Sequence, residues 1–274
     1  MHTKGRWIGA GLVALLAAAT ARAGDPILPP NPTDEDLAMA AQNPVSDLIS
    51  VPFQDIIAFG VGPQREVANI LNIQPVIPFH LTPDLNLVTR TILPIVTMPN
   101  FTGSGSTTGL GNLTFTGFLS PARPGKVIWG AGPVATFPTA TSPQLGSQST
   151  WGLGPSAVVL AMPGSWVVGA LANNVWSVAG AKSNTFLLQY FANYNFESGW
   201  YVVTAPIITA NWDAASGQKW DVPFGGGAGR IVWIGPLPFN LTAQAYWHAI
   251  RPDFGPTWSL RLTATLLLPR SILF

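Results

Sequence analysis

The chain ends in the stretch TWSLRLTATLLLPRSILF (Thr257 to Phe274), in which large apolar side chains alternate with small or polar ones. One parity holds the apolar set and the other the polar set, namely Trp258, Leu260, Leu262, Ala264, Leu266 and Leu268 against Ser259, Arg261, Thr263 and Thr265. Successive side chains of a β-strand point to opposite faces, so the stretch predicts a strand with one apolar and one polar face. Such a strand suits a barrel wall between lipid and a watery lumen.

The amino-terminal residues 1–23 have the pattern of a secretory signal peptide. Basic and polar residues precede an apolar run and a short Ala-Arg-Ala triplet, in the order His2, Lys4, Arg6, Trp7–Ala19 and Ala21–Ala23. We expect cleavage before Gly24 and export of the mature chain. The alternative is an uncleaved membrane anchor, but the apolar run of about 13 residues is shorter than the roughly 20 that span a bilayer.

The composition excludes several classes of protein. Charged residues make up 9% of the chain, against about 25% in soluble domains, and hydrophobic residues make up 47%. Loss of Lys4, Arg6 and Arg22 with the signal leaves 10 basic residues against 12 acidic ones, so the mature net charge is −2. A nucleic-acid partner is not expected on that charge. The chain has no cysteine, which excludes disulfides, thiol chemistry and a lipoprotein anchor.

The apolar middle of the chain favours strands over a membrane-spanning helix. No charged residue occurs from Val127 to Ala181, and mean hydropathy alone would suggest a helix from Ser156 to Val178. That stretch contains Pro163 and Gly164, which break a helix and form a tight turn. A bilayer admits only helices or closed barrels, because every backbone polar group needs a partner there. With 28 Gly and 26 Pro in the chain, we predict an all-β, antiparallel, up-and-down transmembrane barrel.

We divide the chain into a signal peptide (1–23), a linker with a short helix (24–46) and a barrel (47–274). Thr33 is the expected cap of a helix from Asp34 to about Gln42, which Pro44 ends. Whether this helix lies outside the barrel or plugs the lumen is left open by the sequence. The barrel region contains about twelve strand-like segments: six and the terminal stretch alternate clearly, and five are inferred mainly from length and turns.

The connections between the predicted strands alternate in length, as in barrels with short turns at one end and longer loops at the other. The tight ones are Thr82–Asp84, Ala122–Gly125, Pro163–Ser165, Glu197–Gly199 and Gly235–Pro238. The wide ones are Gly60–Glu66, Pro99–Gly111, Pro138–Thr150, Gly180–Asn184, Asp213–Gln218 and Arg251–Pro256. Six tryptophans near strand ends suit aromatic girdles, with ordinary core residues as the alternative: Trp129, Trp151, Trp166, Trp200, Trp220 and Trp258.

No motif predicts catalysis, and we expect no catalytic residue, no metal and no cofactor. The run Gly225 to Arg230 (GGGAGR) lacks the Lys-Ser/Thr ending of a phosphate loop and reads as a bulge or a close backbone approach. The run Gly103 to Gly111 reads as a flexible loop. His80 and His248 fall near opposite rims, and neither has a Ser two residues on, as barrel lipases would. A barrel enzyme would lose lipid hydrolysis on His248→Ala.

The polar parity of the predicted strands identifies the candidate lumen-facing and solute-contacting residues. They are mostly amides and hydroxyls: Asn72, Gln74, Asn86, Arg90, Asn112, Thr114, Gln189, Asn193, Gln244, Tyr246, His248 and Arg261. Strand charges such as Asp55, Asp221 and Arg230 are expected to point inward or lie near a rim, because a charge on the lipid face is costly. For Arg90 and Arg261 the alternative to solute selection is internal salt bridges. Such a lining suits neutral or weakly polar solutes better than ions.

Several segments resemble a family of bacterial exported proteins. They include NPVSDLISVPFQ (Asn43 to Gln54), NILNIQPVIPF (Asn69 to Phe79), LSPARPGKVIWGAGP (Leu119 to Pro133), MPGSWVVGALANNVWSVAG (Met162 to Gly180), FLLQYFANYNFESGWY (Phe186 to Tyr201) and APIITANW (Ala205 to Trp212). The family is labelled as transporters, sometimes under the misleading name neuromedin U, and is similar to outer-membrane barrels associated with phenol degradation. The resemblance implies an outer-membrane barrel of unassigned substrate. Family members end near Leu268, so the tail to Phe274 is a departure.

The leading hypothesis is a twelve-stranded outer-membrane channel or transporter for passive passage of small neutral or hydrophobic and aromatic molecules. The alternative is a structural or adhesive barrel with a closed lumen, and a third reading, a lipid-acting enzyme, is not favoured. The expected partners are outer-membrane lipids, a small solute and the assembly machinery. The terminal strand resembles the closing strand that this machinery recognises, with Phe274 as its last residue.

Overall fold

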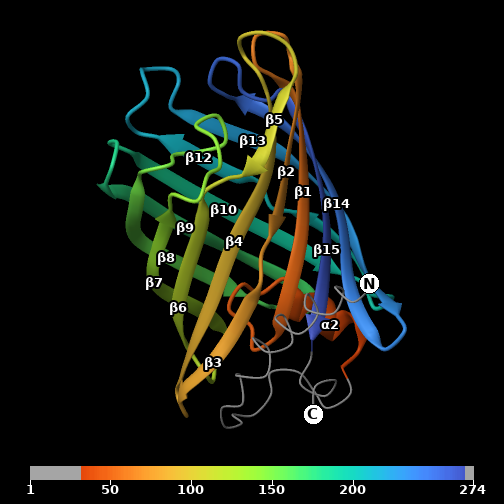
Figure 1. Ribbon diagram of the computed structural model, residues 1–274. Helices are drawn as coiled ribbons and strands as arrows, with labels where there is room; N and C mark the ends of the chain where they lie inside the picture. The colour runs from red at the N-terminus through yellow and green to blue at the C-terminus, as the bar shows by residue number, and fades with distance from the viewer. Residues whose placement is uncertain (1–31, 269–274) are drawn as a thin grey trace, which may run out of the picture.

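The computed structural model describes residues 32–268, which form a closed barrel and one short helix (Figure 1). The helix is α2, Asp34–Ala41. The strands are β1 Ile49–Val61, β2 Glu66–Ile73, β3 Val76–Thr82, β4 Leu85–Pro99, β5 Ser106–Leu110, β6 Leu113–Pro121, β7 Val127–Phe137, β8 Trp151–Ala161, β9 Trp166–Ala179, β10 Asn184–Asn195, β11 Trp200–Thr204, β12 Ile207–Asn211, β13 Trp220–Ile234, β14 Leu237–Ile250 and β15 Trp258–Leu268.

All strand pairs are antiparallel between neighbours in the chain, and β15 pairs with β1 to close the wall. Three wall strands consist of two segments each: β2 with β3, β5 with β6, and β11 with β12. The fifteen segments in the described residues therefore form twelve wall strands, which confirms the predicted fold class. The two strands β8 and β9 occupy the stretch where a helix was rejected. Among residues 32–268, no helix is long and apolar enough to cross a membrane.

Proline accounts for two of the three interruptions. Pro75 separates β2 from β3, and Pro206 separates β11 from β12. Proline has no backbone N–H, so it cannot complete the ladder at these points. Across Pro75 the sequence predicts one continuous strand, because Asn72, Gln74 and His80 share one parity. Across Pro206 alternation is weak, and one strand from Trp200 to Trp212 is predicted from length and bounding turns. The third interruption falls at Gly111 and Asn112.

Two glycine-rich runs belong to strands. The run Gly103 to Gly111, expected to be a loop, contains β5, which pairs with the end of β4 and lengthens that hairpin. The run Gly225 to Arg230 lies inside β13. A Cβ on Gly227 would lie 1.9 Å from the Ala243 carbonyl oxygen of β14, so the close backbone approach predicted there is confirmed. The register of β13 against β14 also shifts between Val222 and Pro223.

Apolar and aromatic side chains cover the outer face of the wall. All six tryptophans assigned to girdles are exposed, so they do not belong to a core. Five of the six begin a strand: Trp151, Trp166, Trp200, Trp220 and Trp258. Exposed Phe53, Leu153, Val202 and Leu241 extend the apolar face between the strand ends. A belt of this kind is typical of barrels that meet lipid.

Asp55 does not point inward, which corrects the expectation for strand charges. Its register partner in β15 is Leu262, an exposed outer residue, and opposed residues of an antiparallel pair share a face. The Asn69 amide of β2 donates a hydrogen bond of 2.6 Å to the Asp55 carboxylate, which reduces the cost of its outward position. Arg230 also faces outward, near the strand end, with its guanidinium 5.3 Å from the ring centroid of Trp200.

The segment from α2 to β1 fills the lumen at the end of the barrel where the tight turns lie. Thr33 caps the helix as predicted: the Asp36 N–H donates to its hydroxyl at 3.1 Å, and the Asp36 carboxylate accepts from the Thr33 N–H at 2.9 Å. The Trp233 indole beside the β13–β14 turn donates to Asp34 at 2.9 Å. We call residues 33–48 the plug. The sequence left open whether the helix lies outside the barrel or in the lumen, and the structure places it in the lumen.

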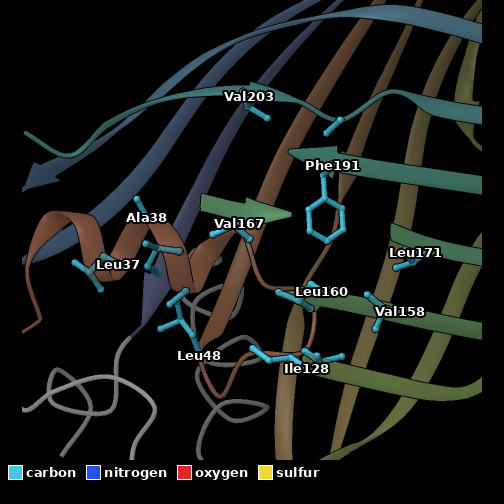
Figure 2. Packing of buried hydrophobic residues seen from close by; sticks show 14 of the residues in the cluster. Leu37, Ala38, Leu48, Ile128, Val158, Leu160, Val167, Leu171, Phe191 and Val203 are labelled. Atoms are coloured by element: carbon cyan, nitrogen blue, oxygen red, sulfur yellow. The ribbon is translucent and has the colours of Figure 1, made fainter. Parts of the chain in front are cut away.

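The plug is held mainly by apolar contacts with the inner wall. Leu37, Ala38 and Leu48 belong to a buried cluster with inward residues of most strands, shown in Figure 2: Ile128, Val158, Leu160, Val167, Leu171, Phe191 and Val203. Figure 2 shows the helix beside these side chains, inside the curve of the strands. The Gln42 amide and the Asn195 amide exchange two hydrogen bonds of 2.7 and 3.2 Å, which fix the end of the helix to β10. The cluster therefore occupies the lumen at this end.

Candidate solute pathway in the lumen

Two adjoining cavities lie in the lumen beyond the plug. The larger has a volume of about 440 Å³ and is lined by inward residues of the wall from β1 to β12, with none from β13, β14 or β15. The smaller, about 200 Å³, lies against the plug residues Gln42, Asn43 and Ser46. The two share four lining residues, Gln74, Arg90, Leu171 and Gln189, which mark their junction. A volume of this order matches the pockets that hold small organic ligands.

Most of the predicted solute-contacting residues gather around these cavities. Asn72, Gln74, Arg90, Thr114 and Gln189 line the larger cavity, and Asn193 and Gln244 join Gln74, Arg90 and Gln189 around the smaller one. Asn86, Asn112, Tyr246, His248 and Arg261 line neither cavity. Asn112 lies at the interruption before β6, where its side-chain oxygen accepts from the Ala140 N–H at 3.3 Å and holds the adjoining loop. That these residues contact a solute stays a prediction.

Further polar residues line the larger cavity without having been singled out from the sequence. They are Gln54, Thr116, Thr136, Ser156, Asn173, Thr185, Thr209 and Asn211. Gln54 and Thr116 carry the polar parity of well-patterned strands, so alternation alone could have identified them. Asn173 and Thr209 come from strands rich in small and apolar residues, where alternation is weak and pairing register decides the face.

Arg90 occupies the junction of the two cavities. It lies on β4 between Val76 of β3 and Thr116 of β6. Its Nη2 donates a hydrogen bond of 2.6 Å to the Gln74 side-chain oxygen, and the Gln74 amide donates to the Gln54 oxygen at 3.2 Å. No Asp or Glu among the described residues forms an ion pair with it. Within residues 32–268, neither Arg90 nor Arg261 forms the internal salt bridge that was the alternative to solute selection.

Arg261 completes the wall where Pro206 interrupts it. The break leaves the backbone groups of Ala205 without ladder partners. The Ala205 carbonyl accepts from Nη1 of Arg261 at 2.9 Å, and the Ala205 N–H donates to the Tyr246 hydroxyl at 3.1 Å. The guanidinium also lies 4.7 Å from the Tyr246 ring centroid, within cation–π range. Arg261 and Tyr246 are thus committed to the wall rather than to a cavity.

His248 bridges two residues of neighbouring strands. Its Nδ1 lies 2.6 Å from an Asp221 carboxylate oxygen of β13, and its Nε2 lies 3.0 Å from the Ser259 hydroxyl of β15. This is the order of groups in a Ser-His-Asp triad. Neither His is followed by a Ser two residues on, but the antiparallel register places Ser259 of β15 opposite Tyr246 and so next to His248. Ser259 and His248 are buried, however, and line neither cavity.

A substrate carbonyl must reach the hydroxyl for such a triad to act. Because Ser259 lines neither cavity, we expect Asp221, His248 and Ser259 to stabilise the pairing of β13, β14 and β15. A His248→Phe variant should lose about 1–3 kcal/mol of unfolding free energy, because Asp221 and Ser259 would each lose a buried partner. Urea unfolding of the folded barrel measures the change, with outward-facing Trp247→Phe as control. An unchanged midpoint would contradict the structural role.

A second histidine cluster lies at the plug end of the barrel. His80 Nε2 lies 3.3 Å from the Asp47 carboxylate, and His80 Nδ1 lies 2.7 Å from the Asn86 side-chain oxygen. Asp47 lies in the plug beside Leu48, just before β1, so this cluster joins the plug to the β3–β4 hairpin. Asn86, predicted to contact solute, is instead buried in this cluster.

No protein-family model matches the chain, and no curated protein sequence matches it. Among solved structures, an outer membrane channel from Pseudomonas putida F1 is similar, with a TM-score of 0.63 and 17% identity over 81% of this chain and 95% of that chain. This likeness establishes the fold. The outer membrane phospholipase A of Escherichia coli is less similar, with a TM-score of 0.45 and 13% identity over 85% of this chain and 97% of that chain. At that level the second likeness carries no argument about chemistry.

Proposed function

We propose that this protein is an outer-membrane channel for the passive passage of small molecules with hydrophobic or aromatic bodies. The observation that carries the proposal is a closed barrel with an apolar outer belt and two adjoining lumen cavities lined by amides, hydroxyls and apolar side chains. A resident of the outer membrane would meet lipids at its outer face and would depend on the barrel-assembly machinery. Those partners, and export by the signal peptide, are part of the proposal; Phe274 lies outside the described residues.

The lining supports small, weakly polar solutes rather than hydrated ions. Apolar residues such as Ile56, Phe118, Leu171 and Ile207 share the larger cavity with the amides and threonines. Apolar walls bind the body of an organic molecule, while scattered amide and hydroxyl groups orient it. The family resemblance noted from the sequence supports an outer-membrane barrel and assigns no substrate.

Solute flux through reconstituted protein tests the proposal. Liposomes that contain the purified, folded barrel should swell in small organic solutes, and planar bilayers should show discrete current steps. The matched control is liposomes without protein. A folded barrel that passes neither solute nor current, even after the plug is loosened as described below, would overturn the channel assignment.

The plug favours one second candidate, a structural or adhesive barrel with a permanently closed lumen. Its buried cluster packs inside one end of the lumen, as a seal would. The two candidates differ in whether the seal can open. Loosening the plug should raise the current of a channel, whereas a structural barrel would lose stability without conducting.

A further inference from the structure

One feature of the lumen does not fit a neutral solute. Arg90 is the one charged residue among the described residues that line either cavity. It makes one hydrogen bond, to the neutral Gln74, and no ion pair within residues 32–268. A guanidinium carries five N–H donors, so most of its donors remain available at the junction of the cavities. A cation removed from bulk water without a counter-charge is unfavourable unless an anion joins it.

The surroundings hold the guanidinium in place for a ligand. Gln54 and Gln74 form a short chain of hydrogen bonds that fixes one side of Arg90. The interruption at Pro75 lies beside it, since the Thr91 N–H bonds to the Pro75 carbonyl at 3.1 Å. The charge is therefore anchored at the wall, and its free edge borders both cavities. Anchoring lowers the entropy lost when a ligand binds.

The other lumen arginine is used differently. Arg261 gives its Nη1 to the Ala205 carbonyl and the Gln244 oxygen, lies over Tyr246, and borders neither cavity. Arg261 therefore completes the wall, whereas Arg90 borders the cavities.

Apolar residues surround the charged point on the cavity side. Ile92 follows Arg90 by two residues on β4 and therefore lies on the same face. Phe118 follows Thr116 in the same way on β6, and Leu171 borders both cavities. A ligand that fits both features has an apolar body and one anionic group. Among anionic groups, a planar carboxylate matches the guanidinium fork best.

We infer that Arg90 is the anion-recognition residue of the lumen and that the solute is a small carboxylate on an apolar, aromatic or alicyclic body. This rests on the proposed channel function and narrows its cargo. The ligand would place its carboxylate on the free edge of Arg90 and its body against the half-buried Ile92 and Ile207 of the larger cavity.

Benzoate and benzamide test the inference, because they share a body and differ in charge. Isothermal titration of the folded protein should show benzoate binding at least about tenfold tighter than benzamide, as expected for a charge-assisted hydrogen bond. Arg90→Gln should remove that preference and leave benzamide binding unchanged, while Arg90→Lys should retain it. Arg123→Gln, which removes an equal charge from an exposed turn residue, should change neither affinity.

Each variant is first shown to be folded by its heat-dependent gel mobility. Failure of wild-type protein to bind benzoate, equal affinity for the two probes, or a full preference retained in Arg90→Gln would overturn the inference. Equal loss in Arg90→Lys and Arg90→Gln would also overturn it, because charge would then not be the cause. These results are independent of flux. If the barrel passes solutes but does not prefer benzoate, the proposed channel function stands and the inferred carboxylate preference is wrong. If the barrel binds benzoate but never conducts, the proposed channel function is wrong.

Discussion

A Leu37→Ala variant should open the lumen far more often than the wild-type protein. Leu37 has 0% of its surface exposed and lies in the centre of the plug cluster. Truncating a buried leucine costs about 2–5 kcal/mol, and here the loss falls on docking of the plug as well as on folding. The open-to-closed ratio should rise by roughly 30-fold to several thousand-fold if the whole loss weakens docking. Single-channel recording measures the open probability.

Plug release can be followed without relying on current. The chain contains no cysteine, so Ala38→Cys supplies a single thiol on the buried side of α2. A maleimide should label that thiol faster in the Leu37→Ala background. Glu35→Gln, on the same helix but outside the buried cluster, is the control and should change neither labelling nor current. Faster labelling with unchanged current would favour the permanently closed barrel.

Gly132→Ala should abolish the folded barrel or destabilise it by more than about 3 kcal/mol. A Cβ at Gly132 would lie only 1.8 Å from the Gly117 carbonyl oxygen, which is backbone of the neighbouring strand β6 and cannot rotate away. The matched control is Gly125→Ala, since nothing lies within 4 Å of a Cβ at that turn position. Gel mobility and urea unfolding report the outcome, and a Gly132→Ala barrel as stable as wild type would contradict the close approach.

Alternation predicted the architecture because burial in a barrel wall has a period of two. Where the inner face is polar, as along β14 with Asn240, Gln244 and His248, the pattern places each residue on its correct face. Where inner residues pack on the plug, as Val158 and Leu160 of β8 do, both faces are apolar and the alternation disappears. The weak segments of the sequence are thus partly the strands that hold the plug.

Other features depend on contacts that local sequence does not record. Asp55 lies on the outer face, against the parity rule, and the Asn69 amide of the neighbouring strand β2 donates a hydrogen bond to its carboxylate. The Asp221–His248–Ser259 group forms only when three strands reach register. The candidate site divides in the same way: parity identified Arg90 and Gln74 as lumen residues, but only the structure separates Arg90 from the wall-bound Arg261.

Within the plug, helix α2 is joined to β1 through Gln42 to Leu48, and this short connection limits how the lumen can reseal. Fully extended, such a tether reaches about 25 Å at most, so a released helix stays near the mouth it left. A segment on a short flexible tether behaves as though present at millimolar concentration. Closure is then a first-order event whose rate does not depend on how many barrels the bilayer holds. A free peptide with the plug sequence would have to reach millimolar concentration to compete for the plug's binding site in the lumen.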